Sequence, residues 1–494
     1  MLEGPPVREQ DVLDTPAAGG KAIRGGFLRI GGYVVGMVLT LASAPLLTRY
    51  LGVEDFGHWV TVLSLVTIVA LVADAGMTVV GVREYAIRDA DGRRVLMANL
   101  LALRMLVAGA GMLLAVAFAA IAGYGGELVL GTALAGFGML IGILQVTYTV
   151  PLISELKLGV VTAVELLRQA FVVAGIIALV LVGGSLIAFF SLFIPACAIA
   201  LLVTVLVVRR FAAIRPALDR VEARHLLAET LPAAAATMLT SLFYRVAVIV
   251  MSLVATPTQT GYFGASFRIV EVIVAVPSLI AGAAFPIMAR AAKTDRVRLA
   301  YALQRLFEAS VILGCWTAIS VVLGAQVGID VLGGEEYQPA VEVLRIQGIA
   351  LAVSFLVAVW AAALWVTGAR RALLTANVVG VSAAIVLTAV LGSLEGAIGA
   401  AIAMTIAEVV LVVALGTALM RPQPDLRADP AIVAKALAAT AAGLSLWFVP
   451  VPDVAQVILG SLAYFAVLLA LRALPPDLLD AARGRIAEPA GPAS

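Results

Sequence analysis

The chain has 494 residues, of which 62% are hydrophobic and 13% are charged, and its mean hydropathy is +1.08. A soluble domain carries about 25% charged residues, so this composition excludes a soluble globular protein. The net charge of +2 gives no sign of a nucleic-acid partner. The sequence also has no GxxxxGK[ST] loop, which excludes nucleotide hydrolysis of the P-loop type. With His58 and His225 as its only histidines, we expect no metal or other cofactor.

Apolar runs of about 20 residues recur along almost the whole chain, and this is the length that crosses a bilayer core of about 30 Å as a helix. Backbone groups in lipid must pair within their own segment, and the strand-like alternation of a membrane barrel is absent. The predicted fold class is therefore all-α, a polytopic membrane protein of about 14 transmembrane helices. We predict helices at 27–48, 57–81, 97–122, 128–151, 160–182, 185–208, 231–254, 263–289, 303–326, 339–366, 372–392, 396–420, 431–450 and 454–473.

A basic, amphipathic break at 209–229 divides twelve of these helices into two groups of six. Phe56-Gly57-His58-Trp59 after the first helix is echoed by Thr260-Gly261-Tyr262-Phe263 after the seventh, which favours two pseudo-repeated lobes. The predicted division is 1–20 disordered cytoplasmic tail, 21–208 N-lobe, 209–229 cytoplasmic linker, 230–420 C-lobe, 421–474 accessory helices and 475–494 cytoplasmic tail.

Charges in the predicted loops alternate strictly in sign. Loops on one side are rich in Arg and Lys, whereas the loops on the other side hold mainly acids, with Arg49 as almost the lone cation. The positive-inside rule places the basic side in the cytoplasm, and an even number of helices then leaves both termini there. The acids of the opposite side are Glu54, Asp55, Glu127, Asp330, Glu335, Glu336 and Asp453.

Three motifs occur in order at corresponding helices between about residues 22 and 420. The first is 48–57 (TRYLGVEDFG) with Asp74-Ala75-Gly76, the second is 260–268 (TGYFGASFR) with Phe285-Pro286, and the third is 334–345 (GEEYQPAVEVLR) with Thr367-Gly368 and the glycines after Gly396. By these motifs the chain resembles the Wzx-type polysaccharide flippases of the multidrug/oligosaccharidyl-lipid/polysaccharide exporter superfamily. It departs from that family at Arg245-Val246-Ala247, where relatives often carry Arg-x-Asp, so the ion coupling of relatives is in doubt here.

The resemblance implies a flippase rather than an enzyme. It would move undecaprenyl-diphosphate-linked oligosaccharide from the cytoplasmic to the outer leaflet of a bacterial inner membrane, by alternating access, for cell-surface polysaccharides such as exopolysaccharide or O-antigen. The implied partners are this substrate, membrane lipid, and the polymerase and export machinery of the same pathway. By the same resemblance, the accessory helices would form a groove for the lipid tail.

Ionisable residues within the predicted spans are costly, so each requires an explanation. Arg245 lies about 14 residues into its helix, or roughly 21 Å, and Arg268 lies at a similar depth on the next helix. Two guanidinium groups at one level predict a site for a diphosphate, which Arg binds in bidentate fashion. The alternative is ion pairing between helices without a ligand, and Glu271 is the i+3 partner of Arg268.

Four further ionisable residues are candidates for the site. Arg29 and Arg104 lie near the cytoplasmic ends of their helices, where they either bind substrate or anchor at headgroups. Asp74 and Glu408 are deep acids that, with Glu271, serve as ion-coupling residues or as counter-ions to the arginines. Glu165 with Arg168, Arg305 with Glu308, and Glu342 with Arg345 are predicted i,i+3 ion pairs without a ligand.

Two other functions remain open. An ion-coupled multidrug or organic-cation antiporter of the same superfamily would use Asp74 and Glu408 as cation ligands. A membrane polymerase or ligase of lipid-linked sugars would need a large outer loop with catalytic groups, but the longest one runs only from about residue 326 to 339.

Overall fold

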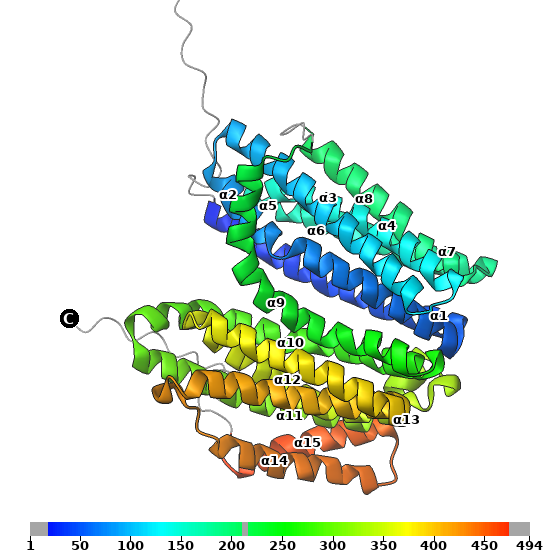
Figure 1. Ribbon diagram of the computed structural model, residues 1–494. Coiled ribbons are helices and arrows are strands. Elements are labelled where there is room, and N and C mark those ends of the chain that lie inside the picture. The colour runs from blue at the N-terminus through cyan, green and yellow to red at the C-terminus, as the bar shows by residue number, and fades with distance from the viewer. Residues whose placement is uncertain (1–17, 210–215, 474–494) are drawn as a thin grey trace, which may run out of the picture. The chain divides into compact units, whose positions relative to one another are not determined.

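The computed structural model describes residues 18–209 and 216–473, and every regular element in these ranges is a helix (Figure 1). Most of the two predicted tails and residues 210–215 of the predicted linker lie outside the described residues. The described chain divides into two units. Unit 1 comprises Met1–Leu51 and His58–Ser241, and unit 2 comprises Gly52–Gly57 and Leu242–Ser494.

Unit 1 is a bundle in which α3 packs on α4, α4 packs on α8, and α6 packs on α8. Its long helices are apolar on most faces, as expected for helices surrounded by lipid and by each other. The elements that contribute to it are α1 (Ala18–Asp74), α2 (Met77–Ile87), α3 (Ala90–Ile121), α4 (Gly126–Tyr148), α5 (Val150–Ser154), α6 (Leu158–Val182), α7 (Leu186–Ser191), α8 (Phe193–Val208) and the first part of α9 (Arg220–Val254).

Unit 2 is built around α12, which packs against α10, α11 and α13. The pair α14 and α15 lies side by side at one edge of this unit and packs on α11 (Figure 1). Its elements are the last part of α9, α10 (Pro257–Thr294), α11 (Arg296–Leu332), η2 (Glu335–Tyr337), α12 (Ala340–Val366), α13 (Arg370–Met420), η3 (Pro424–Leu426), α14 (Ala431–Leu444), η4 (Ser445–Phe448) and α15 (Asp453–Ala470).

The predicted number of crossings is confirmed once two glycine kinks are taken into account. In the described ranges, eleven helices are long and apolar enough to span a membrane, and a shorter apolar helix covers Met238–Val254. Two of the eleven are divided by a glycine with positive φ, namely α1 at Gly52 (φ 69°) and α13 at Gly396 (φ 59°). With each divided helix counted as two crossings and the shorter helix Met238–Val254 counted as one, the described residues contain the fourteen predicted spans. Glycine tolerates this backbone conformation without strain.

The three sequence motifs meet at one junction in unit 2. A Cβ atom added at Gly57 would lie 2.1 Å from the carbonyl oxygen of Pro257, and one added at Gly261 would lie 2.1 Å from that of Val53. The hydroxyl of Tyr337, which is fully buried, donates a hydrogen bond of 2.9 Å to the carbonyl oxygen of Gly52. These contacts leave no room for a side chain at either glycine, so the motif glycines are packing residues.

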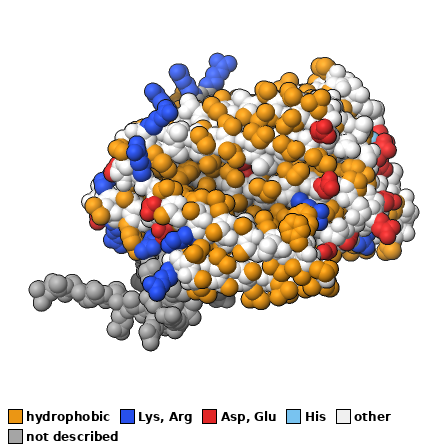
Figure 2. Space-filling view, turned by 90° about the horizontal axis from the view of Figure 1, so that it is seen from below, with side chains coloured by type: hydrophobic (Ala, Val, Ile, Leu, Met, Phe, Trp, Pro, Cys, Tyr) orange, Lys and Arg blue, Asp and Glu red, His pale blue; other side chains and the backbone are white. Residues whose placement is uncertain are grey.

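The molecular surface is suited to lipid. Figure 2 shows a face on which hydrophobic side chains predominate, with most Lys and Arg side chains toward one end. Many large apolar side chains are exposed, among them Leu113 and Leu114 at 74% and 70% and Leu181 at 80%. Exposed apolar area on this scale is expected where lipid replaces water as the solvent.

Candidate functional site

Two groups of ionisable residues lie within the membrane-spanning helices, one in each unit. The group in unit 2, here called the arginine cluster, consists of Arg245 on α9 and of Arg268 and Glu271 on α10. Arg245 forms an ion pair with Glu271, and Nη1 of Arg268 lies 3.7 Å from the second oxygen of the same carboxylate. The structure thus brings the two predicted arginines together around one acid.

The arginine cluster carries more positive than negative charge and stays accessible. The side chains of Arg245, Arg268 and Glu271 are 20%, 32% and 33% exposed. The guanidinium group of Arg245 also lies over the ring of Phe267, 6.0 Å from its centroid, which holds the charge in place. Two guanidinium groups that share one carboxylate retain donors for an incoming anion, and phosphate oxygens match their fork geometry.

Glu408 on α13 lies in the interior of unit 2. Its side chain is only 3% exposed, and it forms a hydrogen bond with the hydroxyl of Tyr244. Its Oε2 atom has no hydrogen-bond partner among the described residues. The part of the chain that the structure describes also contains no group of three or more His, Cys, Asp or Glu residues able to hold a metal ion. The role of Glu408 in ion coupling stays a prediction.

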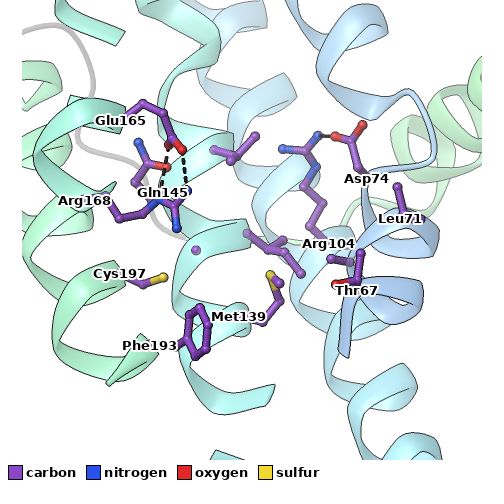
Figure 3. A pocket seen from close by; sticks show the side chains of 14 residues that line it. Thr67, Leu71, Asp74, Arg104, Met139, Gln145, Glu165, Arg168, Phe193 and Cys197 are labelled. Carbon is purple, nitrogen blue, oxygen red and sulfur yellow. Dashed lines mark hydrogen bonds and ion pairs between the residues drawn. The ribbon is translucent and has the colours of Figure 1, made fainter. Parts of the chain in front are cut away.

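The second group lines a cavity of about 390 Å³ within unit 1, here called the polar cavity. Figure 3 shows the Asp74–Arg104 pair on one side of the cavity and the Glu165–Arg168 pair on the other, with Met139 between them. The full lining comprises Thr67, Ala70, Leu71, Asp74, Arg104, Met139, Gly142, Ile143, Gln145, Val146, Glu165, Arg168, Phe193 and Cys197.

Side chains on three other helices, α1, α2 and α4, accept hydrogen bonds from Arg104. Its side chain is 1% exposed, and its Nη2 donates to Asp74 and, over 2.6 Å, to the hydroxyl of Thr78. Its Nη1 donates to the hydroxyl of Thr147 over 3.0 Å. A buried guanidinium group requires such partners, because a lone charge is costly away from water. The guanidinium group of Arg104 is thus neutralised and buried in this structure, and its role in substrate binding stays a prediction. Its carboxylate partner Asp74 is the accessible member of the pair, at 47% exposure.

A break in the second membrane crossing positions Asp74. The predicted helix 57–81 is interrupted after Asp74 by Ala75 and Gly76, which both have positive φ, and α2 begins at Met77. The hydroxyl of Thr78, in the first turn of α2, donates to the Asp74 carboxylate over 2.6 Å. The Asp-Ala-Gly motif of the sequence is thus the turn that directs an acid toward the polar cavity.

The far wall of the polar cavity combines an ion pair with a carboxamide. Arg168 donates to Glu165 as predicted for an i,i+3 pair on α6. Gln145 on α4 is 4% exposed and donates to the hydroxyl of Thr204 over 3.2 Å. Sequence analysis did not single out Gln145, although a lone carboxamide in an apolar span is the signal that would have found it.

The other charged residues predicted within the spans lie outside the two groups described above. Arg29 is an exposed residue near the start of α1 and is not among the residues that line the polar cavity, so its role in substrate binding stays a prediction. The predicted pair of Arg305 and Glu308 is present at 2.9 Å. Arg345, predicted to pair with Glu342, instead has its guanidinium group over the ring of Trp447, 4.5 Å from the centroid.

Comparison with known proteins agrees with the sequence resemblance. Residues 46–342 match the model of a family described as polysaccharide biosynthesis protein, which confirms the predicted kinship with Wzx-type polysaccharide flippases. Among curated proteins, no sequence match is found.

Solved structures show the same fold. The lipid II flippase MurJ in an inward closed conformation superposes with a TM-score of 0.74 at 12% identity, over 93% of this chain and 100% of that one. A multidrug resistance MATE family transporter of the MOP superfamily matches in its inward-facing conformation (TM-score 0.60, 14% identity, 81% of this chain and 98% of that one). An outward-facing conformation of a MATE family transporter matches as well, with a TM-score of 0.57 and 15% identity, over 82% of this chain and 96% of that one. By their descriptions these solved proteins are a flippase and a transporter, and the likeness shows that this chain shares their fold.

Proposed function

Because this chain belongs to the polysaccharide biosynthesis protein family and has the flippase and transporter fold, we propose that it translocates a lipid-linked oligosaccharide across the membrane. The substrate class that we propose is oligosaccharide on undecaprenyl diphosphate, moved from the cytoplasmic to the outer leaflet of a bacterial inner membrane. Both termini would then be cytoplasmic, in agreement with the basic loops on that side. The products would feed cell-surface polysaccharide synthesis, where a polymerase and export machinery act next.

The observation that carries the proposal is the arginine cluster. Arg245 and Arg268 share the single carboxylate of Glu271, so the cluster retains a net positive charge inside the membrane-spanning region. A net positive charge within the membrane is energetically costly, and binding of an anionic group neutralises it. A diphosphate supplies that anion, with oxygens that accept from both guanidinium groups. The prenyl tail would remain in lipid, so that none of its apolar surface becomes exposed to water during transport.

The energy for this transport is available without a nucleotide. Moving a unit charge across the membrane is worth about 2.3 kcal/mol per 100 mV, and the cell interior is negative. Carrying a diphosphate with about two negative charges outward therefore gains about 4–5 kcal/mol at 100 mV. Export of an organic cation would run against the same potential and require an ion gradient. The positive arginine cluster and the direction of the potential both favour the flippase over the drug antiporter.

The mechanism that we propose is alternating access. MATE family transporters of this fold occur in inward-facing and in outward-facing conformations. A site that opens to one leaflet at a time would let the diphosphate and its sugars cross while the membrane stays sealed. The arginine cluster must then bind the substrate in both conformations.

The test is a reconstitution experiment. Purified full-length protein in proteoliposomes receives fluorescently labelled undecaprenyl-diphosphate oligosaccharide, and its appearance in the opposite leaflet is followed with and without an imposed potential, with no nucleotide present. We expect translocation that accelerates when the potential pulls the anion across. Translocation of an organic cation under a proton or sodium gradient, with no movement of the lipid, would replace the proposal with the antiporter.

A further inference from the structure

The polar cavity of unit 1 is separate from the arginine cluster and has a different chemical character. Its volume of about 390 Å³ falls at the small end of the range for ligand pockets, which is about 300–1,000 Å³. It therefore has room for a small molecule or for one small part of a larger substrate. Its lining residues come from α1, α3, α4, α6 and α8, so five helices of unit 1 shape it.

The charges of the polar cavity balance. Its two acids and its two arginines are already ion-paired, Asp74 with Arg104 and Glu165 with Arg168. A phosphate would have to compete with a carboxylate for each guanidinium group, and a cation would have to compete with a guanidinium group for each carboxylate. The cavity consequently favours an uncharged ligand, one that presents apolar faces to most of the lining and hydrogen-bonding groups to its few polar side chains.

The remaining side chains complete the description of that ligand. Asp74 and Glu165 keep 47% and 48% of their side chains accessible, so each carboxylate has acceptor sites beyond its ion pair. Gln145 adds a carboxamide, and Met139 and Phe193 add apolar surface in the same cavity. Carboxylates match the hydroxyl pairs of a sugar ring, whereas apolar and aromatic side chains match its C–H faces.

We propose that the polar cavity is a saccharide subsite, which binds one sugar residue of the lipid-linked oligosaccharide and thereby contributes to substrate selection. The inference rests on the proposed function, because it assigns one part of the same substrate to this cavity. An acyl or prenyl chain is a poorer occupant, since it offers no hydrogen-bond donor to the remaining acceptor sites of the two accessible carboxylates. A site built from hydrogen-bonding groups discriminates strongly against ligands that lack the matching groups.

The experiment compares two lipids. One is the lipid-linked oligosaccharide extracted from the cells that produce this protein, and the other is undecaprenyl diphosphate without a sugar. Translocation rates of both are measured in proteoliposomes for the wild type, for Ala70→Trp, which fills the cavity, and for Gln145→Met, which removes the carboxamide at similar volume. Leu106→Trp on α3 is the matched control, because Leu106 is 57% exposed and absent from the cavity lining.

We expect the wild type and Leu106→Trp to prefer the oligosaccharide lipid by at least about tenfold, and the two cavity variants to lose most of this preference while still moving the sugar-free lipid. A preference that survives in both cavity variants, or is absent from the wild type, would overturn the subsite. If the wild type moves neither lipid, it is the proposed function that fails.

A second readout does not depend on transport. Cys197 lines the polar cavity and is a free thiol, as is Cys315 in unit 2. In a Cys315→Ala background, the rate at which N-ethylmaleimide modifies Cys197 is measured with each lipid present. We expect the oligosaccharide lipid to slow this modification and the sugar-free lipid to leave it unchanged. Equal rates with both lipids would contradict occupation of the cavity by a sugar.

Discussion

The polar cavity of unit 1 and the arginine cluster of unit 2 place arginines in the membrane in opposite ways. In the cavity each guanidinium group has its own carboxylate, and Arg104 is buried to 1% exposure. In the cluster two guanidinium groups share the carboxylate of Glu271 and remain 20% and 32% exposed. The comparison teaches that position in a span does not define a role. What matters is whether the charge is already neutralised by the protein.

The largest effect is expected in unit 1, on stability. Asp74→Ala leaves the buried guanidinium group of Arg104 without its counter-charge, and breaking a buried pair from one side costs about 3–5 kcal/mol. We expect a large loss of folded protein, measured as thermal unfolding in detergent and as abundance in the membrane. Arg104→Met should be milder, because the carboxylate that remains is 47% exposed. An equal loss of folded protein in both variants would contradict the expectation that removing the acid costs more than removing the arginine.

The next effect is expected in unit 2, on transport. Arg245→Ala removes a charged donor from the arginine cluster, and hydrogen bonds to charged groups are worth about 1.5–3 kcal/mol. We expect the translocation rate to fall about 10- to 100-fold, whereas the amount of folded protein in the membrane stays close to that of the wild type. The matched control is Arg94→Ala, which removes an exposed arginine of unit 1 that is absent from the lining of the polar cavity. A similar decline in protein abundance and transport would place Arg245 among the structural charges.

Arg268 should have a smaller effect than Arg245. Its nearest contact with Glu271 is 3.7 Å, and the side chain is 32% exposed, so the pair is loose. Partly exposed pairs contribute up to about 1 kcal/mol, so Arg268→Ala should slow translocation about fivefold. The rates of Arg245→Ala, Arg268→Ala and the double variant give the coupling between the two arginines. Strict additivity would show that they do not act on one group.

The smallest effect is expected at Glu271, where the substitution should increase substrate affinity rather than impair the protein. Glu271→Gln removes the anion that competes with the substrate for both arginines. We expect the affinity for undecaprenyl diphosphate to rise by about two- to fivefold, since a partly exposed ion pair is worth up to about 1 kcal/mol. Displacement of a fluorescent diphosphate lipid from the purified protein measures this change. A lower affinity would mean that Glu271 contacts the substrate itself.

The sequence predicts the architecture well because hydropathy depends on each segment alone. The fourteen crossings follow from length and composition, and the glycine kinks at Gly52 and Gly396 fall where the predicted loops separate helices. The convergence of the three motifs at Gly57, Gly261 and Tyr337 is a tertiary contact, which order along the chain does not reveal. The motifs indicated the family before their packing role was known.

The candidate site was predictable only in part. Depth along two neighbouring helices was enough to place Arg245 beside Arg268, and i+3 spacing was enough to propose Glu271 as the partner of Arg268. The stronger contact of Glu271 with Arg245 depends on how α9 and α10 face each other. The polar cavity depends on five helices at once, so Gln145 could not be assigned to it from the sequence.

The most direct test of the central claim is the initial translocation rate of labelled undecaprenyl-diphosphate oligosaccharide in proteoliposomes under an imposed potential, for the wild type and Arg245→Ala at equal amounts of folded protein. The account predicts translocation that the potential accelerates in the wild type and that falls at least about tenfold in the variant. Equal rates in the two proteins would contradict the assignment of the diphosphate to the arginine cluster.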